Sequence, residues 1–412
     1  MDRKGLSSAA SLRCRECGKE YPLSLKYVCG DCFGPVDVVY DYDSMGLNRN
    51  SFVSRPKSLW RYHEFLPVEL SPESTELQAG YTPLVNSRRL AGELGLGRLY
   101  VKNDTVNPTG SFKDRPAALG VARAVQFGLK SVGCASTGNL AAATSAYAAR
   151  SGVPCFVFVP YDIEPAKVSQ AQAYGANILA VEGTYDDANR LAAQAGELYG
   201  IGVVNINLRP YYVEGSKTLA FEVAEQLGWE VPDHVIIPVG SGAMLHAICK
   251  GFEELRRVGL TDRVPRRVTA VEPAGCAPIA HAFQKGSADV MPVEAPRTIA
   301  KSLAIGDPGD GAYVLKDIRK YGGEVEEVHD EQIVDAVYLL AKSEGIFAEP
   351  AGGVTIAALK KLVEDGRIDK DESVVCYVTG SGLKTPDLLE GSLPRPTRVK
   401  PDARSLSQVI AR

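Results

Sequence analysis

The chain has 412 residues, 45% of them hydrophobic, and a formal net charge of −4 with acidic and basic residues interspersed. This composition supports two or three folded domains and argues against nucleic acid or an anionic membrane as a partner, because both favour a dense basic surface. No apolar stretch approaches the roughly 18 residues of a membrane span, and the start of the chain lacks a leader pattern, so we expect a cytoplasmic protein.

Two C-x-x-C pairs lie near the N-terminus, Cys14 with Cys17 and Cys29 with Cys32. The spacing is typical of two tight knuckles that present thiolates to one tetrahedral metal ion, and zinc is the metal we expect. Residues 1–45 would then form a small zinc-ribbon-like module that takes most of its folding free energy from the metal. One alternative is a metal-free relic packed on the main body, and another is a nucleic-acid-binding regulator whose remaining chain is inert.

After residue 80, short apolar runs alternate with alanine-rich segments, which predicts a parallel sheet covered by helices and therefore an α/β fold. Ligands of such folds bind where strands end in turns that expose backbone amides at the start of a helix. Four glycine-containing turns are therefore candidates for chemistry. The clearest predicted strands are residues 99–101, 155–159, 235–239, 268–271 and 374–378.

The first two candidate turns open onto helices of small residues. Lys113 ends the turn 107–113, just before the predicted helix 117–126. A lysine near the positive end of a helix dipole and beside an aromatic ring is biased toward its neutral, nucleophilic amine. Ser136 and Thr137 belong to the second turn, whose hydroxyls and amides suit a carboxylate. Taken singly, each turn is also compatible with a surface lysine or an ordinary helix cap.

The third and fourth turns each follow an apolar run. The third contains two glycines, so its amides can converge on phosphate oxygens at a helix start. It has neither the lysine of a P-loop nor the spacing of a dinucleotide fingerprint, so we expect a monoester phosphate. The fourth turn places the Thr379 hydroxyl at a strand end, where it suits a pyridine nitrogen. The residues of the third turn are Gly240, Ser241, Gly242, Ala243 and Met244.

Four motifs occur along the chain: Ser-Phe-Lys-Asp-Arg at 111–115, Ser-Thr-Gly-Asn at 136–139, the glycine turn at 240–244 and Thr-Gly-Ser-Gly at 379–382. Together they resemble the fold-type II pyridoxal-phosphate enzymes, and the threonine synthases among them. The cysteine pairs and the segments 214–218, 302–308 and 351–353 extend the resemblance over nearly the whole chain. It implies two parallel or mixed sheets covered by helices, pyridoxal 5′-phosphate as cofactor, and a homodimer.

The resemblance also implies roles for individual residues. Lys113 is then the catalytic lysine that holds the cofactor as a Schiff base, and Asn139 and Thr379 contact the ring hydroxyl and the pyridine nitrogen. The turn 240–244 holds the cofactor phosphate, while Ser136 and Thr137 bind the substrate carboxylate. The candidates for binding the departing phosphate group are Arg209, Lys217 and Lys301.

The implied reaction is that of a carbon–oxygen lyase, which converts O-phospho-L-homoserine and water into L-threonine and phosphate by γ-elimination and β-addition. The turn 240–244 lacks the asparagine-rich form of many threonine synthases. A paralogous β- or γ-replacement enzyme, similar to cysteate synthase or to enzymes of specialised metabolism, is therefore the alternative.

The resemblance implies a division of the chain into domains. The cofactor-binding domain would comprise residues 46–117 and 211–390, and a small mobile domain would comprise residues 118–210 and close over the substrate. Residues 391–412 would form a tail.

The paired cysteine knuckles predict about one zinc ion per chain, because a tetrahedral site uses all the thiolates of both pairs. Metal analysis of the purified protein measures this stoichiometry. A fully active preparation that contains no metal would contradict it.

Overall fold

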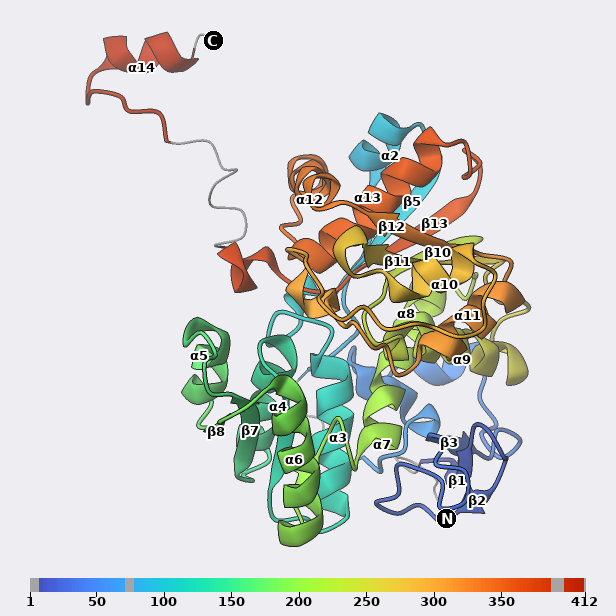
Figure 1. The fold of residues 1–412 in the computed structure, drawn as a ribbon. Helices are drawn as coiled ribbons and strands as arrows, with labels where there is room; N and C mark the ends of the chain where they lie inside the picture. The colour runs from blue at the N-terminus through green and yellow to red at the C-terminus, as the bar shows by residue number, and fades with distance from the viewer. Residues whose placement is uncertain (1–6, 71–77, 387–395, 411–412) are drawn as a thin grey trace.

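The computed structural model describes residues 7–70, 78–386 and 396–410. In these ranges an N-terminal ribbon, a large lobe and a small lobe each contain one sheet (Figure 1). The expected α/β class is confirmed. The helices of the described ranges include none with the length and apolarity needed to cross a membrane. Of the expected tail, residues 391–395 and 411–412 fall outside the described residues.

The six-stranded sheet of the large lobe has the order β12-β11-β10-β13-β5-β4. Its neighbouring strands are parallel except for β4, which is antiparallel to β5. It contains the strands that the apolar runs at 99–101, 235–239, 268–271 and 374–378 predict. The strands are β4 (Leu84–Asn86), β5 (Arg98–Asn103), β10 (His234–Pro238), β11 (Arg267–Pro273), β12 (Val325–Val328) and β13 (Ser373–Val378).

Both faces of this sheet are covered by helices because alternate side chains of each strand point to opposite faces. In β10, Val235 and Ile237 pack in the same core cluster as Leu245 of α9. Ile236, between them, packs in the cluster that includes Ile356 of α13. The helices of the large lobe are α2 (Arg88–Leu94), α8 (Thr218–Gln226), α9 (Ala243–Arg257), α10 (Pro278–Gln284), α11 (Gly311–Lys320), α12 (Asp330–Glu344) and α13 (Pro350–Glu364).

The small lobe contains a parallel sheet of order β8-β7-β6-β9, which includes the predicted strand at 155–159. It falls inside the interval 118–210 that we expect for a mobile domain, and the domain boundaries themselves stay a prediction. Its strands are β6 (Val132–Ala135), β7 (Cys155–Pro160), β8 (Asn177–Val181) and β9 (Gly202–Val203), and the helices in and beside it are α3 (Asp114–Gln126), α4 (Asn139–Arg150), α5 (Ala166–Ala173), α6 (Tyr185–Tyr199) and α7 (Arg209–Glu214).

The ribbon consists of β1 (Ala9–Cys14), β2 (Glu20–Tyr21) and β3 (Val36–Tyr40), which are antiparallel. It docks on the main body through β3. The Tyr40 hydroxyl donates a hydrogen bond of 2.7 Å to Glu214 of α7, and the Lys250 ammonium of α9 donates one of 3.0 Å to the carbonyl of Val38. The last helix, α14 (Ala403–Ile410), lies apart from the lobes and has no buried residue (Figure 1).

A buried ion-pair network joins the start of α3 to the core of the large lobe. The Arg115 guanidinium donates to Asp104 at 2.7 and 2.8 Å and to Glu222 at 2.9 Å. The Lys102 ammonium lies 2.6 Å from Glu222 Oε2, the same oxygen that accepts the 2.9 Å hydrogen bond from Arg115, and both the Lys102 and Glu222 side chains are fully buried. Burial opposes the ionisation of Glu222, yet Arg115 and Lys102 outweigh it and lower the pKa of Glu222 to about 2.

Glu222→Gln is expected to lower the free energy of unfolding by about 3 to 5 kcal/mol near pH 7, because it leaves Arg115 and Lys102 without their shared carboxylate. The folded pKa of Glu222 lies below its ordinary value of 4.5, so the stabilisation is present above about pH 4.5 and is lost as the pH falls toward 2. Urea unfolding across this pH range measures the difference between wild type and variant, which should shrink on acidification. Glu93→Gln, at an exposed position of α2, is the control and should change little.

Candidate functional site

A cavity of about 570 Å³ opens between the large and small lobes. It brings together the predicted cofactor and substrate residues of the main body, with the exception of Lys217. Its walls come from turns that follow strands of both sheets, as expected for an α/β fold. They include Lys113, Ser136, Thr137, Asn139, Arg209, Gly240, Ser241, Gly242, Ala243, Met244, Lys301, Glu349 and Thr379.

Lys113 is the residue immediately before α3, and its amine faces the cavity. The Nζ atom lies 4.5 Å from the centroid of the Phe112 ring and donates a hydrogen bond of 3.3 Å to the Tyr212 hydroxyl. Desolvation lowers the pKa of Lys113 to about 8, although the nearby carboxylate of Glu349 acts in the opposite direction. The predicted bias toward a neutral amine therefore has a physical basis in burial.

Backbone contacts hold the Lys113 turn against the fourth glycine turn. The Phe112 N–H donates to the Thr379 carbonyl at 2.8 Å, and the Ser381 N–H donates to the Gly110 carbonyl at 2.9 Å. On its other side, the Asp114 carboxylate accepts hydrogen bonds from the backbone N–H and the hydroxyl of Thr109. Arg115 is held in the buried network, and Lys113 reaches the cavity together with its neighbour Phe112.

The second turn leads into α4 through Gly138, whose φ of 61° and ψ of −123° suit a residue without a Cβ. Ser136 and Thr137 line the cavity just before this helix start. The Asn139 amide donates to both carboxylate oxygens of Glu349, at 3.1 and 3.0 Å. Burial raises the pKa of Glu349, and the Asn139 hydrogen bonds, Lys384 and Lys113 act against this rise.

The third turn joins β10 to α9 and is packed closely on two other segments. A Cβ at Gly240 would lie 3.1 Å from Ile305 Cδ1, and one at Gly242, where φ is +93°, would lie 2.8 Å from a methyl of Val314. No side chain caps the first turn of α9. This turn lines the cavity, and a helix start whose amides have no side-chain cap is an arrangement that can bind phosphate.

The structure separates the cationic candidates for substrate binding. Arg209 and Lys301 both line the cavity. Lys217 does not: its side chain is fully buried elsewhere, with its amine 2.6 Å from Glu214 and 2.9 Å from Glu254. The expectation that Lys217 binds the substrate is corrected, because a lysine so paired supports the packing of α7 and α9 and has no access to the cavity.

The cavity is also lined by residues that no sequence motif indicated, namely Glu349, Tyr212, Tyr185 and Asn205. Glu349 lies immediately before α13, beside the fourth turn, where its N–H donates to the Gly380 carbonyl at 2.9 Å. A Cβ at Gly380 would lie 2.3 Å from a Glu349 carboxylate oxygen. In the sequence, Glu349 is marked only by its position before a helix that begins with proline. Its place in the site becomes clear only from its contact with Asn139, which is distant in the chain.

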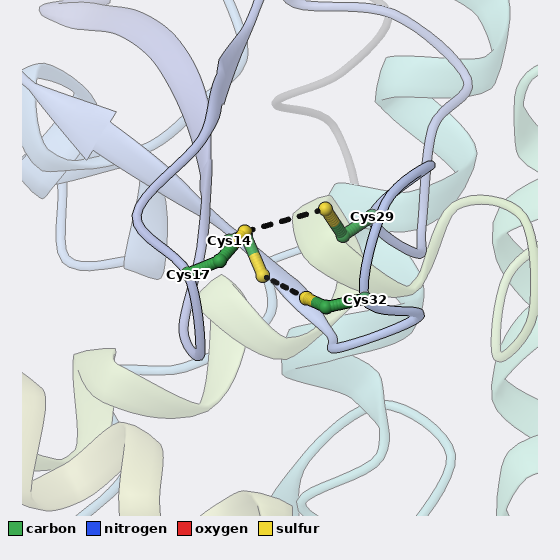
Figure 2. A group of neighbouring side chains, drawn as sticks. All are labelled: Cys14, Cys17, Cys29 and Cys32. Atoms are coloured by element: carbon green, nitrogen blue, oxygen red, sulfur yellow. Dashed lines mark hydrogen bonds between the residues drawn. The ribbon is translucent and has the colours of Figure 1, made fainter.

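The cysteine sulfurs of the ribbon converge on one point (Figure 2). All four lie within 4.8 Å of one another, with Cys14 and Cys32 at 3.4 Å and Cys17 and Cys29 at 3.6 Å. Thiolates around a tetrahedral zinc ion are about 3.8 Å apart, given zinc–sulfur bonds of about 2.3 Å. The donor set and its spacing therefore fit zinc, which we keep as the proposed metal.

Residues 75–380 match the family model of pyridoxal-phosphate dependent enzymes. Threonine synthase of Methanocaldococcus jannaschii is 42% identical over 97% of this chain and 98% of its own length. The chain belongs to the threonine synthase family of pyridoxal-phosphate-dependent enzymes. Threonine synthase of Methanosarcina acetivorans is 40% identical over the same shares of both chains. A diaminopropionate ammonia lyase from Escherichia coli shares the fold, with a TM-score of 0.64 and 22% identity over 79% of this chain and 94% of its own.

The family assigns pyridoxal phosphate as the cofactor, and the residues of the cavity fit it. A partly desolvated amine at Lys113 suits a covalent link to an aldehyde. The turn 240–244 offers a narrow, glycine-lined place for phosphate, and Thr379 lies at the end of β13 on the cavity wall. Lys113, the turn 240–244, Asn139 and Thr379 are thus the residues that we propose hold the cofactor.

Lys113→Ala is expected to lower kcat by about 100-fold or more, because the cavity loses the amine that holds the cofactor and moves protons. Borohydride reduction followed by peptide mass spectrometry should locate the cofactor adduct of the wild type on Lys113. Lys130→Ala, at an exposed position, should retain both the adduct and activity. An adduct mapped to another lysine would contradict the assignment.

Proposed function

We propose that this protein converts O-phospho-L-homoserine and water into L-threonine and phosphate. The observation that carries the proposal is one cavity that contains the Lys113 amine, the glycine turn 240–244 and two further cationic side chains, Arg209 and Lys301. A monophosphorylated cofactor needs the turn, and a second phosphate on the substrate explains the additional cations. Two relatives that match this chain over nearly their full length are named threonine synthases, which supports the same substrate.

Bound pyridoxal phosphate supplies an electron sink that acidifies the carbon–hydrogen bonds close to the substrate amino group. The protein supplies the base, and Lys113 is the group placed to act as one. Its pKa of about 8 gives the amine a larger neutral fraction near neutral pH than an exposed lysine has, and the Tyr212 hydroxyl lies 3.3 Å from Nζ to orient it. We propose that Lys113 moves the α-proton and then a β-proton before phosphate leaves the γ-carbon.

The remaining cavity residues are assigned by charge and position. Ser136 and Thr137, at the start of the 12-residue helix α4, suit the substrate carboxylate. Arg209 and Lys301 suit the phosphate group, whose negative charge increases as it leaves. Glu349, held by Asn139 and raised in pKa by burial, is placed to keep or release a proton beside Lys113. A proton is then returned to the γ-carbon, which becomes the methyl group, and water adds to the β-carbon to give threonine.

The proposal extends to the behaviour of the whole protein. The cavity lies between two lobes, so a movement of residues 118–210 against 46–117 and 211–390 would close it over substrate and exclude water. We also propose that the enzyme is a cytoplasmic homodimer, in keeping with a substrate that is a small amino-acid phosphate.

Cofactor-loaded protein is expected to release phosphate and L-threonine in equal amounts from O-phospho-L-homoserine. Amino-acid analysis with a colorimetric phosphate assay measures both products. The comparison substrate is O-phospho-L-serine, with and without sulfite, and it should give little product. Turnover of the serine phosphate alone would contradict the proposal and identify a β-replacement enzyme.

A further inference from the structure

One buried carboxylate, that of Asp310, is shared between the cysteine ribbon and the cavity. Its Oδ1 accepts a hydrogen bond of 2.9 Å from Arg15, and its Oδ2 pairs with Arg209. Arg15 lies between Cys14 and Cys17, whereas Arg209 lines the cavity. The side chain of Asp310 is only 1% exposed, and that of Arg209 is 28% exposed. A single carboxylate thus connects the ribbon to Arg209, a residue proposed to bind the substrate phosphate.

Arg15 is itself held firmly. Its Nε and Nη2 donate to the two carboxylate oxygens of Asp37 at 2.5 and 2.7 Å, and its guanidinium lies 4.7 Å from the centroid of the Tyr313 ring. The neighbouring Glu16 accepts a hydrogen bond from the Tyr313 hydroxyl. The Arg15 side chain is 10% exposed. A guanidinium with this many fixed partners is pre-organised to present its remaining nitrogen to Asp310.

Asp310 also contacts the glycine turn through its backbone. Its N–H donates to the Ser241 carbonyl at 3.0 Å. A Cβ at Gly242 would lie 3.0 Å from the Cβ of Asp310, so the two segments are in close contact. Any shift of Asp310 would therefore disturb both the turn proposed to hold the cofactor phosphate and the orientation of Arg209.

This cluster contains two positive and two negative side chains, so its charges balance. The cations are Arg15 and Arg209, and the carboxylates are Asp37 and Asp310. Without the charge of Arg15, a buried carboxylate would be left undercompensated beside the cavity. The uncompensated negative charge of Asp310 would bind Arg209 more strongly and would repel a phosphate group that enters the cavity. Arg15 thereby keeps Arg209 available for a phosphate group.

We propose that Arg15, on the first cysteine knuckle, is a positioning residue for anion binding in the cavity and acts through Asp310 on Arg209. The inference rests on the proposed function in taking the anion to be the substrate phosphate. If Arg15 acts in this way, the ribbon contributes to the affinity for substrate in addition to any structural role.

Arg15→Gln is expected to weaken binding of inorganic phosphate to the cofactor-loaded enzyme by about fivefold or more, as measured by calorimetry, and to raise the KM for O-phospho-L-homoserine by a similar factor. The kcat should change less than KM, since Lys113 is untouched. Arg15→Lys, which keeps one positive charge, should recover part of the affinity. The matched control is Arg13→Gln on the same ribbon, because Arg13 is 51% exposed and pairs with Glu20; it should match wild type.

The double variant Arg15→Gln with Asp310→Asn separates electrostatics from loss of folding. Removal of both charges restores the balance around Arg209, so the double variant should bind phosphate more tightly than Arg15→Gln alone. A double variant that binds no better, or an Arg15→Gln protein within twofold of the Arg13→Gln control, would overturn the proposal. Phosphate binding is measured without turnover, so a wild type that binds phosphate but yields no threonine would refute the proposed function and leave this test intact.

Discussion

The buried pairing of Arg115 with Asp104 and Glu222 is the interaction on which the geometry of the cavity depends. Arg115 is two residues from Lys113, and its guanidinium is fully buried among carboxylates from two other segments. Charges in such a place are tolerated only when their partners are fixed, so the start of α3 has one well-defined position. This fixed helix start also fixes the position of the Lys113 amine, which faces the cavity as a partly desolvated base.

Much of the fold and a large part of the cavity were predictable from local patterns. The apolar runs at 155–159 and 374–378 are strands, and the turn at 240–244 lines the cavity at a helix start. These features depend on a few consecutive residues. Strand order and the pairing of β5 with β13 could not be predicted in this way, because they depend on contacts between distant segments.

The site residues that sequence reasoning misplaced or missed depend on distant partners. Lys217 has the same charge as Lys301, yet the structure surrounds it with Glu214 and Glu254 and removes it from the cavity. Glu349 becomes interpretable only when Asn139, far earlier in the chain, is seen to hold its carboxylate. Charge alone cannot separate a cation that neutralises a buried acid from one that meets a ligand.

The position of β13 in the large sheet has a consequence for how the protein is made. β13 lies between β10 and β5, yet among the strands of the described residues it is the last to leave the ribosome, at Ser373–Val378. Until then β5 lacks its parallel neighbour, whereas the small sheet, at residues 132–203, is already complete. Domains form as their chains emerge during synthesis, and unpaired strand edges are prone to aggregate. The nascent large lobe therefore exposes an open sheet edge during most of translation, and Thr379 reaches the cavity only at the end.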